Sequence, residues 1–285
     1  MKLKDVFEKT VQFFKEKKIE TARLDAELII AHALRIDRLQ IYLKYEQPLS
    51  ESEVSLCRDF VRRRSLGEPV AYILGEKGFY GEIFSVGPGV LIPRPETELI
   101  VEQALDFAKN KDQLRVLDLG AGSGCIGLAI LKNSLKTHPN TKLVSVEKSP
   151  EAFSYLQKNA ELLGLAAASE LILSDVRDLS YAEESFDVIV ANPPYIASDD
   201  PLVESSVKKF EPEAALFSAD RGLADIRTWS EHCLKLLNSP GLMLFEMGHS
   251  QGPEAEAHFR RLPGIKKTEI LKDLAGFDRV IRAEK

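Results

Sequence analysis

Apolar residues in the first 67 positions recur at intervals of three or four, the spacing that gathers them on one face of a helix. The stripes consist of Leu3, Val6, Phe7, Val11 and Phe14, then of Leu24, Leu28 and Ala31, and then of Val54, Cys57, Phe60 and Val61. Ser50 and Glu53 have the spacing of a capping box at the start of the last stripe. The pattern predicts a small helical domain.

Three consecutive arginines, Arg62, Arg63 and Arg64, come shortly before Gly67, where the last of these helices should end. Cations near the carboxyl end of a helix complement its dipole. A basic run can equally contact RNA or an acidic partner. The sequence leaves these alternatives open.

Glycine and proline interrupt short aromatic and β-branched runs between residues 67 and 95. Such punctuation is typical of turns that join short strands. We expect a linker that contains a β-hairpin. The predicted boundaries are a helical domain at 1–75, a hairpin linker at 76–92 and a larger domain at 93–285.

From residue 96 onward, segments with helical spacing alternate with short apolar runs of the kind found in buried strands. The expected helices are 96–110, 125–131, 150–163 and 223–237, and the expected strands are 114–119, 142–147, 171–173, 186–191, 241–246, 265–271 and 279–282. The last two strands are close enough for an antiparallel pair. Residues 196–216 are polar and irregular, as in a functional loop. The alternation favours an α/β domain.

The strand at 114–119 runs into a glycine-rich turn, Gly120-Ala121-Gly122-Ser123-Gly124, ahead of an apolar helix. Glycines let a ligand approach the first amides of a helix, and an acid at the end of the next strand, here Glu147, can bind ribose hydroxyls. The pair predicts an adenosine-ligand site. Alternatively, Glu147 is a solvated strand terminus. Asp175 could accept a hydrogen bond from an adenine amine or cap the following turn.

The strand at 186–191 ends in Asn192-Pro193-Pro194-Tyr195. Two prolines hold the backbone extended just beyond the strand, where an open α/β sheet binds its ligands. The Asn192 carbonyl and a proline-flanked backbone carbonyl can accept two hydrogen bonds from one planar NH2 group, and Tyr195 offers a π-face. A rigid turn is the alternative.

Trp229 and His249 are expected to be packing residues. Cys125 is also expected to be a packing residue, although a thiolate would be favoured at its helix start.

Composition narrows the class of protein. The 285 residues are 44% hydrophobic and 29% charged, as in a soluble globular protein. With three dispersed cysteines and no apparent signal peptide or membrane span, we expect a reducing cytoplasm. No metal-ligand spacing occurs, so no metal site is expected. The net charge of -6 argues against a duplex-binding enzyme.

Four ordered motifs resemble the release factor glutamine methyltransferases, also called PrmC or HemK. They are residues 67–75 (GEPVAYILG), 91–98 (LIPRPETE), 192–195 (NPPY) and 210–212 (FEP). The resemblance spans nearly the whole chain. It implies the seven-stranded, doubly wound S-adenosylmethionine-dependent methyltransferase fold, with an antiparallel last strand, after a helical domain and a hairpin linker.

The resemblance also implies roles for the motif residues. Gly120, Ala121, Gly122, Ser123, Gly124, Glu147, Asp175, Val176 and Asn192 would bind S-adenosylmethionine. Asn192, Pro193 and Tyr195 would be catalytic, and together with Pro194 they would bind the substrate. Glu147 stands where aspartate is more usual, and Val176 where some relatives carry an aromatic residue.

The implied substrate is the glutamine of the Gly-Gly-Gln loop in class I peptide chain release factors, gripped by both the helical and the catalytic domain. Other candidates are a glutamine methyltransferase for a ribosomal protein, an adenine methyltransferase for nucleic acid, and a cofactor-binding protein that only docks on release factors. We expect a monomer that binds neither a membrane nor nucleic acid stably.

Overall fold

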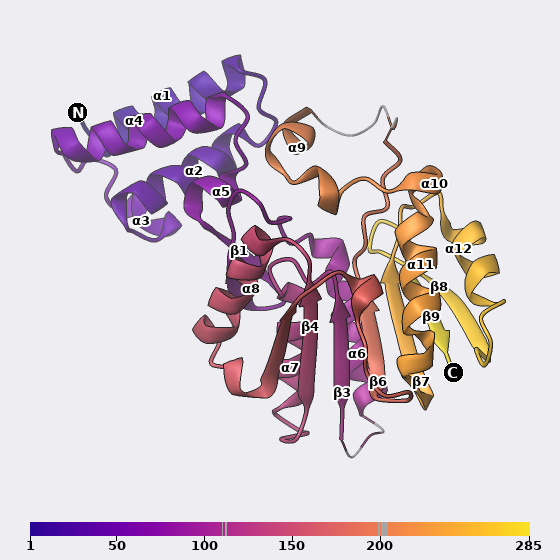
Figure 1. Cartoon of the computed structure of the whole chain (residues 1–285). Coiled ribbons are helices and arrows are strands. Elements are labelled where there is room, and N and C mark those ends of the chain that lie inside the picture. Colours follow the sequence, from indigo (N-terminus) through magenta and orange to yellow (C-terminus); the bar gives the residue numbers. More distant parts are fainter. Residues whose placement is uncertain (110, 112, 199, 201–204) are drawn as a thin grey trace. The chain divides into compact units, whose positions relative to one another are not determined.

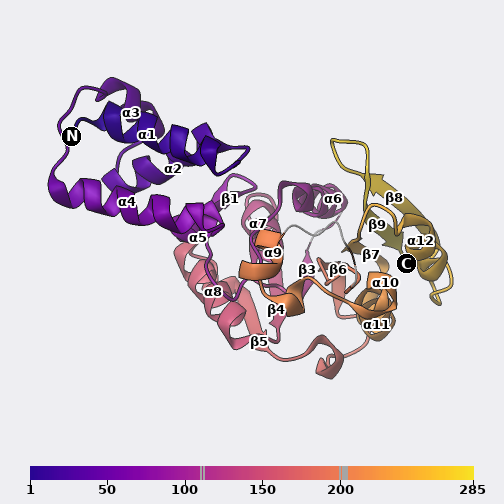
Figure 2. The same cartoon turned by 90° about the horizontal axis from the view of Figure 1, so that it is seen from above.

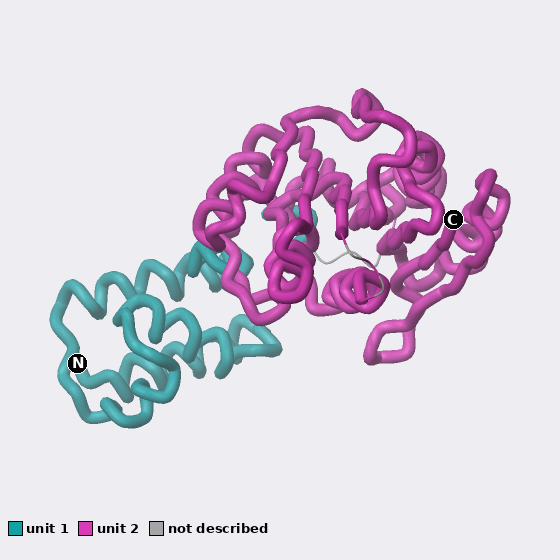
Figure 3. Tube along the Cα trace, turned by 90° about the horizontal axis from the view of Figure 1, so that it is seen from below, with its two compact units in different colours: residues 1–76, 205–210 teal, residues 77–204, 211–285 magenta. Residues whose placement is uncertain are grey.

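The computed structural model describes residues 1–109, 111, 113–198, 200 and 205–285. The chain divides into two compact units (Figures 1 and 3), of which unit 1 comprises residues 1–76 and 205–210, and unit 2 comprises residues 77–204 and 211–285. Whether these units correspond to domains with the expected boundaries after residues 75 and 92 stays a prediction.

Unit 1 is helical. Its helices are α1 (Leu3–Glu16), α2 (Ala22–Leu34), α3 (Arg38–Leu43), α4 (Glu51–Ser65), α5 (Val70–Leu74) and α9 (Ser205–Phe210). The apolar stripes of α1 and α2 meet in a core with fully buried Phe7, Phe14 and Ile29. The predicted capping box starts α4, because the Ser50 amide donates to the Glu53 carboxylate at 2.7 Å and the Glu53 amide to the Ser50 hydroxyl at 3.3 Å.

The arginines at the end of α4 are largely engaged within unit 1. Arg64 pairs with the buried carboxylate of Asp25 at 2.7 Å and also donates to the backbone carbonyl of Glu68 at 3.1 Å. Arg63 pairs with the Glu68 carboxylate at 2.5 Å. Both side chains therefore tie the residues after α4 to the helical core.

Unit 2 is built on a seven-stranded sheet in the order β5-β4-β3-β6-β7-β9-β8. The strands are β3 (Arg115–Leu119), β4 (Lys142–Glu147), β5 (Ser169–Leu173), β6 (Phe186–Ala191), β7 (Leu237–Glu246), β8 (Lys267–Lys272) and β9 (Asp278–Glu284). Strand β9 is antiparallel to both neighbours, whereas β3 to β7 pair in parallel. The predicted fold is confirmed, as is the expected hairpin, formed by β1 (Glu76–Phe79) and β2 (Glu82–Ser85).

Helices cover both faces of this sheet, as Figures 1 and 2 show. The larger helices are α6 (Glu98–Ala108), α7 (Cys125–Ser134), α8 (Pro150–Leu162), α11 (Ala224–Cys233) and α12 (Gly252–Phe259), and short turns are η1 (Pro95–Thr97), η2 (Ala166–Ala168), η3 (Val176–Asp178), η4 (Glu213–Ala215), α10 (Ala219–Gly222) and η5 (Leu234–Leu236). Val116 packs in the core with α6, α7 and α8, and its neighbour Leu117 packs in the core with α11 and α12. This alternation follows from the two-residue period of a strand.

Several expectations need correction. The polar stretch 196–216 is not irregular throughout, because it contains α9 and η4, while residues 199 and 201–204 lie outside the described residues. The helix expected at 96–110 ends at Ala108, and residue 110 also lies outside them. Helix α12 was not expected. No helix among the described residues is long and apolar enough to cross a membrane.

Candidate active site

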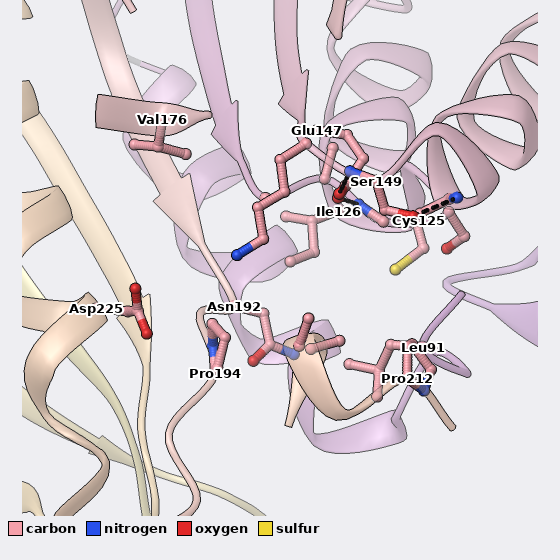
Figure 4. A pocket seen from close by; sticks show the side chains of 18 of the residues that line it. Leu91, Cys125, Ile126, Glu147, Ser149, Val176, Asn192, Pro194, Pro212 and Asp225 are labelled. Carbon is pink, nitrogen blue, oxygen red and sulfur yellow. Dashed lines mark hydrogen bonds between the residues drawn. The ribbon is translucent and has the colours of Figure 1, made fainter. Parts of the chain in front are cut away.

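A pocket opens in unit 2 at the carboxyl ends of β3, β4, β5 and β6. Strands β4 and β5 lie on one side of β3, and β6 and β7 lie on the other, so the order of the strands reverses at β3. Open α/β sheets bind ligands at such a switch point. The lining comprises residues 120–123, 147–149, 174–177, 192 and 194 beyond the strand ends, and residues 89, 91–94, 97, 125, 126, 152, 212, 214, 215, 225 and 229 around them. In Figure 4, Asn192 lies between Val176 and Asp225 on one side and Leu91 and Pro212 on the other.

The glycine-rich turn takes the shape that its sequence requires. Gly120, Gly122 and Gly124 all have positive φ angles, of 63°, 57° and 80°. An added Cβ at Gly120 would come within 2.7 Å of the Trp229 ring, whereas one at Gly122 would have its nearest neighbour, Val90, at 3.8 Å. Packing therefore excludes a side chain at Gly120, and the backbone angle alone disfavours one at Gly122.

Glu147 is 8% exposed and is not a solvated strand terminus. One carboxylate oxygen accepts from the Gly122 amide and the other from the Ser149 amide, both at 2.8 Å. These bonds fix the carboxylate at the pocket wall. A carboxylate can accept about four hydrogen bonds, so the group retains capacity for a ligand.

Asp175 caps the turn that follows it. Its carboxylate accepts from the Arg177 amide at 2.9 Å and from the Arg177 guanidinium at 2.8 and 2.6 Å. These bonds from Arg177 lower the pKa of Asp175 to about 2. The capping alternative is confirmed, and contact with an adenine stays a prediction. Val176, which is 4% exposed, adds an apolar surface to the lining.

Only part of the Asn-Pro-Pro-Tyr stretch lines the pocket. Asn192 and Pro194 line it, whereas Pro193 and Tyr195, like Gly124, do not line the pocket that the described residues form. The Asn192 amide nitrogen donates to the Thr97 hydroxyl at 3.3 Å.

Tyr195 is anchored away from the pocket lining. Its hydroxyl donates to Glu246 at 3.1 Å, and its backbone carbonyl accepts from Gln251 at 2.9 Å. Burial raises the pKa of the Tyr195 phenol far above its usual value, so the hydroxyl stays protonated at neutral pH.

Sequence reasoning missed several lining residues. Trp229, expected to be a packing residue, contributes to the pocket, as do Lys148 and Asp225. The Asp225 carboxylate accepts from the Ser218 hydroxyl at 2.6 Å. None of these side chains belongs to a local motif. In contrast, the wall at 91–94 and 212 comes from two motifs that were visible in the sequence.

The exposure of Cys125 and His249 decides the roles of these two residues. Cys125 lines the pocket, but burial raises its pKa to about 12, so it is a neutral thiol rather than a nucleophile. The packing role expected for His249 is wrong, because this residue is exposed and touches the Phe277 ring edge at 5.7 Å between centroids. No group of His, Cys, Asp or Glu among the described residues could hold a metal ion.

Comparisons with known proteins add to this geometry. Residues 5–75 match the family "PrmC N-terminal domain" and residues 110–246 match "Methyltransferase domain". The "Release factor glutamine methyltransferase" of Geobacter sulfurreducens is 37% identical over 280 residues, which cover 98% of this chain and 95% of the relative. The protein of the same name from Rhodopirellula baltica is 35% identical over 285 residues, with 98% and 95% covered.

A solved structure shares the fold. The hMettl16 catalytic domain, in complex with the MAT2A 3'UTR hairpin 1, superposes with a TM-score of 0.55 at 18% identity, covering 79% of this chain and 80% of that one. At this level of identity the similarity concerns the fold alone.

Proposed function

Because this chain belongs to the family of release factor glutamine methyltransferases, we propose that it methylates the side-chain amide of the glutamine in the Gly-Gly-Gln motif of class I peptide chain release factors. The methyl donor would be S-adenosylmethionine. The observation that carries the proposal is the position of Asn192, whose side chain lines the same pocket as Glu147 and the glycine-rich turn.

The residues of the pocket fit this cofactor. Glu147 presents a carboxylate suited to a ribose diol, and Val176 beside Asp175 offers an apolar surface with a polar edge for an adenine. Gly120, Ala121, Gly122 and Ser123, which line the pocket, would border the methionine part. The first amides of α7, which have no acceptor within the helix, suit its carboxylate. When bound, S-adenosylmethionine supplies an electrophilic methyl group on its sulfonium.

The chain would contribute orientation and electrostatics. An amide nitrogen is a poor nucleophile because its lone pair is delocalised into the carbonyl. The Asn192 side-chain oxygen and the Pro193 backbone carbonyl would accept its two N–H groups, which orients the nitrogen and favours the charge that develops. Pro194 would keep this stretch extended, and Tyr195, whose hydroxyl donates to Glu246, would support it from outside the pocket lining. A methylated amide nitrogen with positive charge is very acidic, so no strong base is needed.

Unit 1 would hold the body of the release factor. Helix α3 supports this role because Leu39 and Leu43 are 77% and 82% exposed and lie one helical turn apart. Large apolar side chains on one exposed helix face are typical of protein contacts.

One assay separates the candidate substrates. The purified chain would be incubated with labelled S-adenosylmethionine and, separately, with a class I release factor, the same factor with its Gly-Gly-Gln glutamine replaced by alanine, a ribosomal protein and DNA. We expect label in the unaltered factor alone. Label that persists in the alanine variant, or that appears in the ribosomal protein or the DNA instead, would overturn the proposal.

A further inference from the structure

A buried carboxylate lies behind the pocket, at the end of β7. Glu246 is 1% exposed, and its two oxygens each accept one hydrogen bond, from the Thr97 hydroxyl at 2.5 Å and from the Tyr195 hydroxyl at 3.1 Å. Thr97 is itself 1% exposed and accepts from the Asn192 side-chain nitrogen at 3.3 Å. Glu246, Thr97 and Asn192 thus form a chain of hydrogen bonds that ends at the pocket.

The number of available hydrogens fixes which group donates in each of these hydrogen bonds. A carboxylate has no hydrogen to donate, and a threonine hydroxyl has one. Thr97 gives that hydrogen to Glu246, so its oxygen can only accept from Asn192. The Asn192 amide must therefore turn its NH2 group to Thr97 and leave its oxygen for the pocket. In the reversed orientation, two oxygens would face each other with no hydrogen between them.

This direction requires an ionised Glu246, the form in which both carboxylate oxygens accept, as they do here from Thr97 and Tyr195. Burial raises the pKa of this carboxyl, and the hydroxyls of Thr97 and Tyr195 and the charge of Arg279 work against the rise, while Glu96 adds to it. A protonated Glu246 could donate to Thr97 and free the threonine hydrogen for Asn192. The amide would then turn its NH2 group to the pocket.

We propose, on the basis of the proposed function, that Thr97 and Glu246 are positioning residues that hold the Asn192 oxygen towards the substrate and so make the site select glutamine over glutamate. A glutamine amide presents two N–H donors to the Asn192 oxygen. A glutamate carboxylate presents only oxygens, which repel it. Reversal of the Asn192 amide would weaken this discrimination.

The test uses the full-length enzyme with S-adenosylmethionine and an intact release factor. A copy of the factor with glutamate in place of the Gly-Gly-Gln glutamine serves as a competitive inhibitor. For each variant, the turnover rate, the cofactor Kd and the ratio of the inhibition constant to the substrate KM are measured. Thr97→Val removes the hydroxyl at nearly constant shape, Thr97→Ser restores it, and Glu246→Gln replaces a carboxylate, which can only accept, by an amide that can either accept from Thr97 or donate to it.

We expect Thr97→Val to lower turnover by roughly 10- to 100-fold and to reduce the preference for glutamine at least about 10-fold, as for loss of a preorganised polar group. The cofactor Kd should stay within about 2-fold, because positioning acts on the substrate amide. Thr97→Ser should resemble the wild type, and Glu246→Gln should also weaken the preference.

Thr141→Val is the matched control, because Thr141 is likewise 1% exposed and donates its hydroxyl hydrogen to the His138 carbonyl, outside the pocket lining. It should change melting temperature without changing the preference. A folded Thr97→Val enzyme with wild-type turnover and preference, or a Thr97→Ser enzyme as impaired as Thr97→Val, would overturn the inference. Failure of the wild-type enzyme to methylate the glutamine would instead refute the proposed function.

Discussion

Arg94 and Glu211 form an ion pair of 2.5 Å at the pocket wall, although 117 positions separate them in the chain. The Glu211 side chain is 2% exposed and also accepts from the Ile92 amide at 3.1 Å. Pro212, the next residue, lines the pocket. The pair therefore connects two of the motifs that stand out in the sequence and holds the segment after Glu211 against the wall that precedes α6.

Replacing Arg94 by methionine should loosen this wall. Glu211 would keep the hydrogen bond from the Ile92 amide but lose its charged partner. A buried carboxylate without a charged partner is destabilised. We expect cofactor affinity to fall by about 10-fold, the equivalent of about 1.4 kcal/mol. Calorimetry measures the Kd for the cofactor. Lys272→Met, which removes an exposed ion pair with Asp278, is the control. Equal affinities in both variants would show that the wall does not depend on Arg94.

Gly122 offers a test of the glycine-rich turn. An added Cβ would make only an ordinary van der Waals contact, with Val90 at 3.8 Å, so Gly122→Ala should fold, with a loss of about 1–2 kcal/mol because φ is 57°. Gly122 lines the pocket, so strain at this position would shift the amides of the turn that a ligand would approach. We expect the Kd for S-adenosylmethionine to rise by about 10-fold or more, a binding loss of about 1.4 kcal/mol or more. An unchanged Kd in the folded variant would exclude this turn from the cofactor site.

Asp118 makes stability depend on pH. It is fully buried beneath α7, one oxygen accepts from the Gly127 amide at 3.0 Å, and the other has no hydrogen-bond partner among the described residues. Burial raises its pKa from 3.8 to about 7. Between these values, the folded protein keeps a proton that the unfolded chain has released, so the free energy of unfolding falls as pH rises.

Asp118→Asn has no proton to lose in this range. From about pH 4 to pH 8, its free energy of unfolding relative to wild type should rise by at most about 4 kcal/mol. Urea unfolding without cofactor at several pH values gives this difference. The same pH dependence in both proteins would show that Asp118 ionises normally.

Much of the fold was predictable because its signals are local. Strands β4 and β6 have the predicted bounds, since each is a short, mainly apolar run rich in β-branched residues and bounded by polar or turn-forming residues. The six-residue helix α9 is too short to show a periodicity, and α12 has few buried apolar positions, so both escaped prediction.

The site was predictable only where a motif carries it. Glu147 was identified because an acid at a strand end after a glycine turn has a known geometry. The two alternatives for Asp175 could not be separated, because they depend on where the Arg177 side chain lies. Trp229 and Glu246 had no signal: a lone tryptophan in a helix or an acid at a strand end fits a core as well as a site.

The docking role of unit 1 predicts a change in KM alone. Leu39→Glu combined with Leu43→Glu places two charges on the exposed face of α3 and should leave its fold intact. We expect the KM for an intact release factor to rise by about 10-fold or more, as for loss of an interface anchor, with cofactor Kd unchanged. Leu274→Glu, at a fully exposed position in unit 2, is the control. Unchanged KM in the double variant would remove α3 from the docking surface.

Asn192 gives the most direct test of the proposed chemistry. Asn192→Ala removes an oxygen whose value is greatest in the transition state, so single-turnover methyl transfer to a release factor should fall by roughly 100-fold or more, while cofactor affinity changes little. Tyr195→Phe should be milder, because it keeps the ring and loses only the hydrogen bond to Glu246. If the stretch is merely a rigid turn, Asn192→Ala and Tyr195→Ala would instead lower the melting temperature and leave the folded enzyme at its normal rate. Thermal unfolding measured beside single-turnover rates therefore separates a chemical role from a structural one.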